Sequence, residues 1–228
     1  MWIVIGIIAA LLVVIVIIAI GKGSSSDSHR GVFHVPSDQE QQEAFGKHGE
    51  HTVFQMVSKI AEENGGYAYE NVAFKDDNGY STEIDAILIC SGGFFVIEVK
   101  SNKGIITGGL EDERWHAEKE PWQEDRNPHN PVKQNQGHIN HLKRMAGKGF
   151  PYITSLVIFP YATNIDAVRS QIVHDYYSAQ TFIRERIAEG KYKKATVDRF
   201  NEQLKAFRSR YGISHEEHMR CIHEKFEA

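Results

Sequence analysis

The sequence predicts an α/β fold in which helices flank a central β-sheet. Two runs, Ile84–Cys90 and Phe94–Val99, are rich in β-branched and aromatic residues, which is typical of strands. Their apolar residues fall on both faces, so we expect a sheet that is covered on both sides. Longer stretches with apolar residues at helical spacing lie before and after these runs. The composition, 41% hydrophobic and 25% charged, is that of a globular protein rather than a disordered chain.

The beginning of the chain differs from the rest. Residues 2–20 are an uninterrupted run of apolar residues and glycine, long enough to cross a bilayer as a helix at ~1.5 Å per residue. No Lys or Arg precedes this run, whereas a signal peptide, the alternative interpretation, normally begins with a basic segment. Lys22 and Arg30 follow it, so the positive-inside rule predicts a single-pass membrane anchor with the rest of the chain in the cytoplasm. Residues 21–36 are polar and are expected to be a flexible linker.

A long helix is expected next. Ser37-x-x-Glu40 has the spacing of a helix capping box, and the predicted helix runs to residue 64 with interruptions near Gly46 and Gly49. Glu50 lies about one turn before its apolar face, where it is either a solvated acid or part of a site. That face is expected to consist of Val53, Phe54, Val57 and Ile60.

Further strands surround the two central ones. Tyr67–Phe74 is predicted to be a strand and Asp76–Gly79 a turn. Gly104–Leu110 is predicted to be another strand. Glu111–Arg126 is rich in acidic residues and is expected to form a hairpin and a loop that lie away from any bound phosphate backbone.

A second helix begins at Asn130-Pro131, because Asn is a good cap and Pro suits the first helical position. Gln134, His138 and Leu142 share one face of this helix. Its other side is basic, which suits either a phosphate backbone or solvent. Tyr152–Phe159 is a further predicted strand, and residues 37–165 are expected to form one domain.

Residues 166–228 are expected to be a helical C-terminal extension, with helices over 178–189, 196–210 and 214–226. The last helix contains four possible metal ligands. A zinc cluster is not favoured there, because the first two share a face and the others diverge from it. The four residues are His215, His218, Cys221 and His223.

The two central strands carry charges that such strands seldom contain, because a buried charge without a partner is very costly. Gly92-Gly93 suits a two-residue hairpin turn. In that register Asp85 faces Lys100 across the ladder, and Glu98 lies one diagonal step away on the same face. A different turn would change this arrangement.

Two carboxylates and one ammonium group on one patch suit divalent-metal chemistry. Carboxylate oxygens are the ligands that Mg²⁺ and Mn²⁺ prefer, and a neighbouring Lys can orient a water or stabilise charge that develops on a phosphate. The alternative is purely structural: Asp85 and Lys100 form a partly buried ion pair, with Glu98 at its rim.

This pattern resembles the core of the PD-(D/E)xK nuclease superfamily, and its surroundings resemble the nuclease-related domain (NERD). The resemblance covers residues 45–163, about half the chain. Its elements are Gly49-Glu50 with Val53, Asp85, Glu98-Val99-Lys100, Gly104-x-Ile106, Trp115, Asn130-Pro131-x-x-Gln134 and Leu142.

The resemblance implies a restriction-endonuclease-like mixed sheet and metal-dependent hydrolysis of nucleic-acid phosphodiesters, with DNA as the expected partner. It implies that Asp85, Glu98 and the Val99 carbonyl hold Mg²⁺ or Mn²⁺. Lys100 is then expected to position a water or stabilise the pentavalent state, with Glu50 and Gln134 in support.

The net charge of −4 gives no global basic field that would indicate nucleic-acid binding. The two cysteines give no disulfide framework. Two other classes of function therefore stay open beside a nuclease. One is a catalytically idle nucleic-acid-binding module, and the other is a membrane-tethered interaction protein in which the charged patch only stabilises the fold.

Overall fold

The computed structural model of the chain describes residues 37–118 and 127–227, and the described residues from Asp38 onward belong to one compact unit. The helices are α2 (Asp38–Glu63), α3 (Pro131–Ala146), α4 (Tyr176–Glu189), α5 (Lys194–Tyr211) and α6 (His215–Glu227). The strands are β1 (Tyr67–Lys75), β2 (Ser81–Cys90), β3 (Gly93–Val99), β4 (Gly104–Thr107), β5 (His116–Glu118), β6 (Ile153–Phe159), β7 (Ala162–Asn164) and β8 (Val173–Asp175).

The membrane span expected at residues 2–20 and the linker expected at 21–36 lie outside the described residues. Among the helices of residues 37–118 and 127–227, none combines the length and the apolar character that crossing a bilayer requires.

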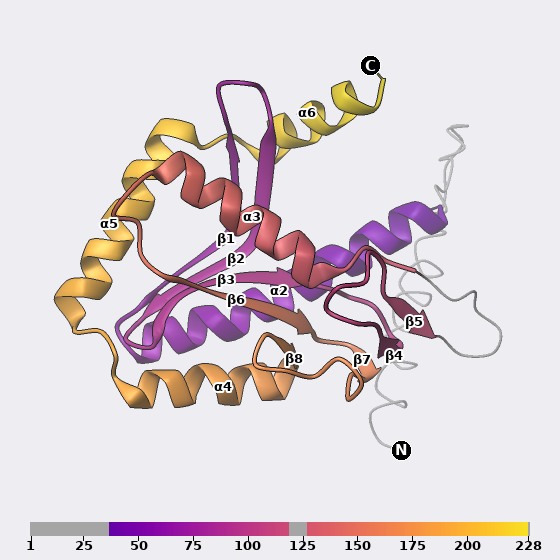
Figure 1. Cartoon of the computed structure of the whole chain (residues 1–228), viewed down its shortest axis with the longest axis horizontal. Helices are drawn as coiled ribbons and strands as arrows, with labels where there is room; N and C mark the ends of the chain where they lie inside the picture. The colour runs from indigo at the N-terminus through magenta and orange to yellow at the C-terminus, as the bar shows by residue number, and fades with distance from the viewer. Residues whose placement is uncertain (1–36, 119–126, 228) are drawn as a thin grey trace, which may run out of the picture. The chain divides into compact units, whose positions relative to one another are not determined.

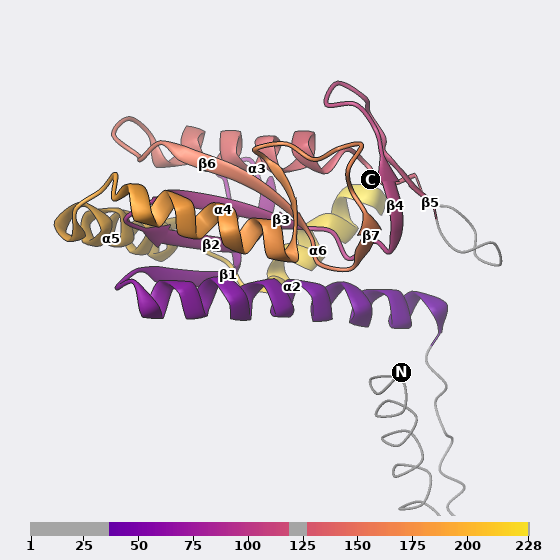
Figure 2. The same cartoon turned by 90° about the horizontal axis from the view of Figure 1, so that it is seen from below.

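The centre of the unit is a five-stranded mixed sheet in the order β1-β2-β3-β6-β8, which confirms the expected α/β class. The first three strands are antiparallel, and β6 pairs in parallel with both β3 and β8. Helix α3 covers one face and α2 covers the other (Figures 1 and 2). Buried side chains of α4 pack on the α2 side of the sheet, and those of α5 pack on the α3 side.

A smaller sheet in the order β5-β4-β7 lies beside the C-terminal end of strand β6 (Figure 1). Its core contains Trp115, whose ring stacks on Phe159 at 6.2 Å between ring centroids. The expected strand at Gly104–Leu110 is shorter than predicted, because β4 ends at Thr107. Strand β8 lies within residues 166–228, so the stretch expected to be a helical extension also contributes a strand to the central sheet.

The β2–β3 register differs from the predicted one by two residues. Cys90 pairs with Gly93, so the two-residue turn is Ser91-Gly92 rather than Gly92-Gly93. Gly93 is instead the first residue of β3, with φ of +152°, a conformation that L side chains rarely adopt. Gly92 lies against the backbone of α4, where a Cβ atom would be 2.8 Å from the Arg186 carbonyl carbon. Because the shift is an even number of residues, the predicted face of the strands is kept.

The regular alternation of β2 breaks at Asp85. Ile84 lies in the same buried cluster as Ile87, whereas a regular strand would place residues three apart on opposite faces. Ile84 and Ala86 therefore lie on opposite faces, although a regular strand would place residues two apart on the same face. On the neighbouring strand Asn71, between the paired residues Glu70 and Val72, has φ of +50°. Asn71 and Asp85 lie opposite each other, and neither takes part in the regular pairing of β1 with β2.

Helix α2 is continuous through Gly46 and Gly49, so the interruptions predicted at these glycines are wrong. Gly49 is buried where the helix passes the residues that follow β3. A Cβ atom on Gly49 would lie 3.1 Å from the Ser101 Cβ and closer still to the Ser101 Oγ. Tertiary packing, rather than helix propensity, thus explains this glycine, because only a residue without a side chain allows so close an approach.

Candidate functional site

The structure brings Asp85, Glu98 and Lys100 together where β2 and β3 separate. The last β2–β3 pair is Ala86 with Ile97. One step further, Asp85 Oδ2 accepts a hydrogen bond of 2.7 Å from the Val99 backbone N–H. A side-chain oxygen thus replaces a strand carbonyl as the acceptor, and it fixes the Asp85 carboxylate beside the end of β3.

Lys100 pairs with Glu98 on its own strand, not with Asp85 across the ladder as predicted. Its Nζ is 2.7 Å from Glu98 Oε1. The Glu98 side chain is 2% exposed and the Lys100 side chain 23% exposed, so the ammonium group is the accessible end of this pair. The rim position predicted for Glu98 in the purely structural alternative is therefore wrong.

The second oxygen of Glu98 faces α3. His138 Nδ1 lies 3.4 Å from Glu98 Oε2, but neither atom has a hydrogen-bond partner among the described residues. A buried carboxylate oxygen without a partner is unusual and costly. A further donor or a cation would satisfy this oxygen.

Glu50 joins this cluster from α2. Close packing of Gly49 on Ser101 brings the adjacent turn of α2 against the end of β3. Burial raises the pKa of Glu50, and the nearby Glu83 and Glu98 carboxylates raise it further. The charges of Glu50, Asp85 and Glu98 therefore influence one another, and the supporting role predicted for Glu50 stays a prediction.

The cluster carries more negative than positive charge. Burial raises the pKa of Asp85 well above its usual value, and Glu98 and Glu50 add to this effect. Burial also acts to raise the pKa of Glu98, but Lys100 and His138 outweigh it and hold the pKa below its usual value. Burial acts to lower the pKa of Lys100, but the surrounding carboxylates keep it raised. Glu98 and Lys100 thus form an ion pair, whereas Asp85 and Glu50 have no cation of their own and hold their protons more tightly than usual.

Helix α3 delivers two further side chains, Gln134 and His138, from its first turns. Asn130 caps the helix: its Oδ1 accepts from the backbone N–H groups of Val132 at 3.0 Å and Lys133 at 3.3 Å, as predicted for Asn130-Pro131. The Asn130 Nδ2 donates to three carbonyls of the loop at residues 109–112. This residue therefore fixes both the start of α3 and the loop beside it.

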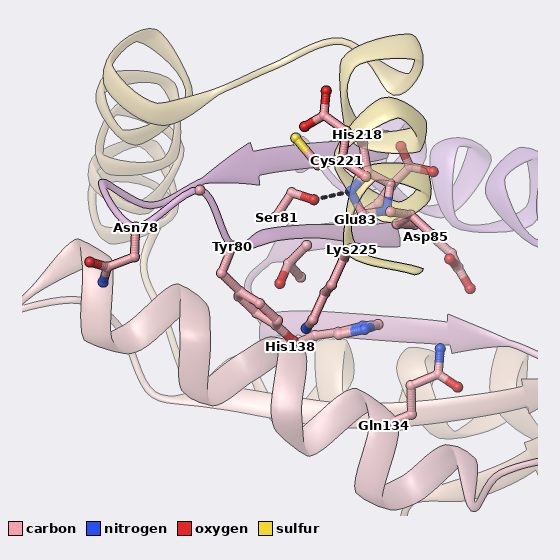
Figure 3. A pocket seen from close by; sticks show the side chains of 14 residues that line it. Asn78, Tyr80, Ser81, Glu83, Asp85, Gln134, His138, His218, Cys221 and Lys225 are labelled. Atoms are coloured by element: carbon pink, nitrogen blue, oxygen red, sulfur yellow. Dashed lines mark hydrogen bonds between the residues drawn. The ribbon is translucent and has the colours of Figure 1, made fainter. Parts of the chain in front are cut away.

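A cleft of about 970 Å³ reaches the site at Asp85. Gln134 and His138 line it from α3, Asp85 and Glu83 from β2, and His218 and Lys225 from α6 (Figure 3). The sequence did not place His138 or α6 at the site. The helical spacing of His138 from Gln134 was a usable signal, but nothing local in the sequence indicates that α6 returns to β2.

The donor set suits a hard divalent cation. Asp85 and Glu98 supply carboxylate oxygens, one of which has no hydrogen-bond partner among the described residues, and these carboxyl groups outnumber the neighbouring Lys100 ammonium group. Mg²⁺ and Mn²⁺ prefer such oxygen ligands. Among the described residues no three His, Cys, Asp or Glu side chains are arranged as a ready metal site, so any ion here would need backbone oxygens or water as well.

The four residues considered for a zinc cluster do not gather in the described part of the chain. His215 and His218 turn toward β2: His215 Nδ1 is 2.9 Å from Glu83 Oε2, and His218 Nδ1 is 2.9 Å from Ser81 Oγ. They serve to attach α6 to the sheet.

Comparison with known families identifies the domain. The model of the nuclease-related domain (NERD) matches residues 45–160. The chain belongs to the nuclease-related domain family. The NERD match runs from within α2 to just after β6, so it includes Glu50, Asp85, Glu98, Lys100 and Gln134. It leaves out α4, α5 and α6.

One curated relative is an uncharacterized protein of Bacillus anthracis, 32% identical over 119 residues. The aligned part is 50% of this chain, and the chain spans about half (53%) of that relative's length. No solved structure matches the chain.

Proposed function

We propose that this NERD protein is a metal-dependent nuclease that hydrolyses phosphodiester bonds of DNA. The observation that carries the proposal is the cluster of Asp85, Glu98 and Lys100 where the cleft reaches Asp85, because the buried carboxyl groups there outnumber the one ammonium group that pairs with them. A nuclease that binds a divalent cation and a phosphate needs such an arrangement. A patch that only stabilised the fold would gain more from paired charges.

Asp85, Glu98 and the Val99 carbonyl are the groups that would hold Mg²⁺ or Mn²⁺. A bound ion of this kind lowers the pKa of a coordinated water and neutralises charge on the scissile phosphate. The Val99 N–H fixes Asp85 for this role, and the ion pair with Lys100 fixes Glu98. Because both carboxylates are held before substrate arrives, little reorganisation is needed in the reaction.

Lys100 is the residue that would act on the substrate. In the reaction a water oxygen forms a bond to phosphorus, one phosphorus–oxygen ester bond breaks, and the departing oxygen takes up a proton. The Lys100 ammonium, partly exposed and held at 2.7 Å by Glu98, would donate hydrogen bonds to that water or to the phosphate as negative charge develops. Gln134 and Glu50 would orient the water from α3 and α2.

The chain would be tethered to the membrane by residues 2–20, with the NERD domain in the cytoplasm. The apolar run and the positive charges that follow it support this proposal. Fractionation of cells that express the full chain tests it: the protein should stay in the membrane pellet in high salt and at alkaline pH and dissolve only in detergent. A chain that salt alone releases would contradict the anchor.

Cleavage of labelled DNA in Mg²⁺ by the full chain tests the nuclease. Asp85→Asn and Lys100→Met should each lower the rate by at least ~100-fold, on the scale of losing a preorganised electrostatic group. Asp77→Asn is the matched control, because Asp77 is an exposed acid in the β1–β2 turn. The Asp77→Asn protein should cleave DNA at the wild-type rate.

Two results would favour the rival functions. Salt-dependent DNA binding without any product would indicate an idle nucleic-acid-binding module. No binding at all, with loss of stability in Asp85→Ala, would indicate an interaction protein in which the cluster is structural.

A further inference from the structure

Helix α6 forms one side of the cleft that leads to the proposed catalytic residues, although it lies outside the NERD match. Figure 3 shows the cleft between α3 on one side and α6 on the other, with β2 and the β1–β2 turn between them. We call the α6 lining residues the α6 wall: His218, Cys221, Ile222, Glu224 and Lys225.

One end of the cleft is closed by a chain of side-chain contacts. Lys225 Nζ of α6 lies 4.8 Å from the ring centroid of Tyr80, in the turn before β2. The Tyr80 ring in turn lies 4.9 Å from the ring of His141 on α3. The α6 wall, the turn and α3 therefore meet at Tyr80.

The size of the cleft limits what can enter it. A volume of about 970 Å³ is at the upper end of the ~300–1,000 Å³ that holds one small ligand, which corresponds to one or a few nucleotides. A B-form duplex has two backbones separated by grooves ~12 Å and ~6 Å wide, so its cross-section is far larger than one nucleotide and we expect the α6 wall to exclude it. Since Glu98 is 2% exposed, a scissile phosphate must come down to the site rather than be cut at the surface.

The chemistry of the lining favours bases over a phosphate backbone. Lys225 is the one Lys or Arg among the described residues that line the cleft, and Glu83, Asp85 and Glu224 line it as well, so its charge disfavours contact with a phosphate backbone along its length. Asn78 and Gln134 offer neutral donors and acceptors, whereas the hydroxyl groups of Ser81 and Thr82 are already bonded to His218 and His141. Tyr80 is 47% exposed, and an unpaired base would stack on its ring by displacing the Lys225 ammonium group that lies over it.

We propose that the cleft takes a single, unpaired nucleic-acid strand, with a base against Tyr80, and that the α6 wall excludes duplexes. This inference rests on the proposed function for its catalytic centre, but it concerns which form of nucleic acid the site admits.

Helix α6 is attached in a way that allows a clean test. Its contacts to the sheet are polar: His215 with Glu83, His218 with Ser81, and an ion pair between Glu217 and Lys75. No described α6 side chain takes part in the buried apolar clusters. Loosening α6 should therefore leave the folded core intact.

The first measurement is fluorescence anisotropy of the full chain in EDTA, with one labelled DNA oligonucleotide as a single strand and as a blunt duplex. We expect the single strand to bind at least ~10-fold more tightly. Equal affinity, or tighter binding of the duplex, would overturn the inference.

Two sets of variants test the α6 wall and the Tyr80 ring separately. Glu217→Lys places a positive charge against Lys75 and leaves the residues that line the cleft unchanged. The repulsion should loosen α6 and let the duplex bind, so the ratio of single-strand to duplex affinity should fall several-fold. Glu216→Lys, the neighbouring exposed position, is the matched control and should leave the preference unchanged. Tyr80→Ala should weaken single-strand binding roughly 5- to 100-fold, whereas Tyr80→Phe should retain it. If the two Lys variants behave alike, the α6 wall does not exclude duplexes.

Cleavage then distinguishes this inference from the proposed function. Asp85-dependent products formed equally fast from both DNA forms would refute single-strand selectivity and leave the nuclease standing. Strong single-strand preference in EDTA without any product in Mg²⁺ would support the cleft assignment and refute the nuclease.

Discussion

Close packing between α2 and the residues after β3 makes Gly49→Ala the most quantitative test of how the site is built. The added Cβ would lie 3.1 Å from the Ser101 Cβ and 3.3 Å from the Tyr161 Cε2. Ordinary carbon contacts are ~3.5–4.0 Å, so the Ser101 hydroxyl, which would lie 2.0 Å from the added Cβ, must rotate away, and α2 or its neighbours must shift by about half an ångström. Overpacking of this kind costs ~1–3 kcal/mol, and the helical Gly→Ala change returns ~0.5–1 kcal/mol. The net loss is about 1–2 kcal/mol.

Thermal denaturation of the metal-free chain measures this loss. For a unit of this size ~1 kcal/mol corresponds to ~2–4 °C, so Gly49→Ala should lower the melting temperature by roughly 2–8 °C. Gly46→Ala in the same helix is the matched control: its Cβ meets nothing within 4 Å, so it should be neutral or stabilising. Adding Ser101→Gly to Gly49→Ala should restore part of the free energy of unfolding. The double variant should be at least ~1 kcal/mol more stable than the sum of the two single changes predicts. If Gly49→Ala melts like Gly46→Ala, or if Ser101→Gly gives no rescue, the close approach does not position Glu50.

Three further predictions concern stability. In EDTA, the raised pKa of Asp85 means that the folded state holds this proton more tightly than the unfolded chain, so stability should fall as pH rises from the usual carboxyl pKa through the raised one. Asp85→Asn should remove that decrease in melts recorded across pH, and a decrease of the same size in the variant would assign it to other groups. Asn71→Val should cost ~1–3 kcal/mol because a β-branched residue opposes φ of +50°, whereas Asn71→Gly should be neutral in chemical denaturation; equal losses would show that the backbone is not the cause. Asn130→Ala should cost about 2–3 kcal/mol, since it removes a helix cap and the partner of three loop carbonyls, and a loss below ~0.5 kcal/mol would contradict this role.

Patterns local in the sequence predicted much of the fold. The apolar runs at Ile84–Cys90 and Phe94–Val99 correspond to β2 and β3, and Asn130-Pro131 does begin α3. These elements are set by residues close in the chain: strand formers, turn residues and caps. The clustering of Asp85, Glu98 and Lys100 also followed, because an even shift of register keeps a face.

The features that were missed depend on distant residues. Ser91, Gly92 and Gly93 all suit a turn, and the choice between them rests on packing of Gly92 against α4. From the sequence alone Gly49 is expected to interrupt the helix, because its close contact with Ser101 is formed only in the folded structure. The contact between His138 and Glu98, and the return of α6 to β2, arise from tertiary structure that no local pattern records.

The most direct test of the central claim is a single reaction followed through removal and return of metal. The full chain is mixed with labelled single-stranded DNA in Mg²⁺, then excess EDTA is added, and then Mg²⁺ is restored above the chelator. We predict that product forms, stops and resumes, and that Asp85→Asn forms none in any phase. Product that continues through EDTA, or that Asp85→Asn forms at the wild-type rate, would contradict a metal-dependent nuclease centred on Asp85, Glu98 and Lys100.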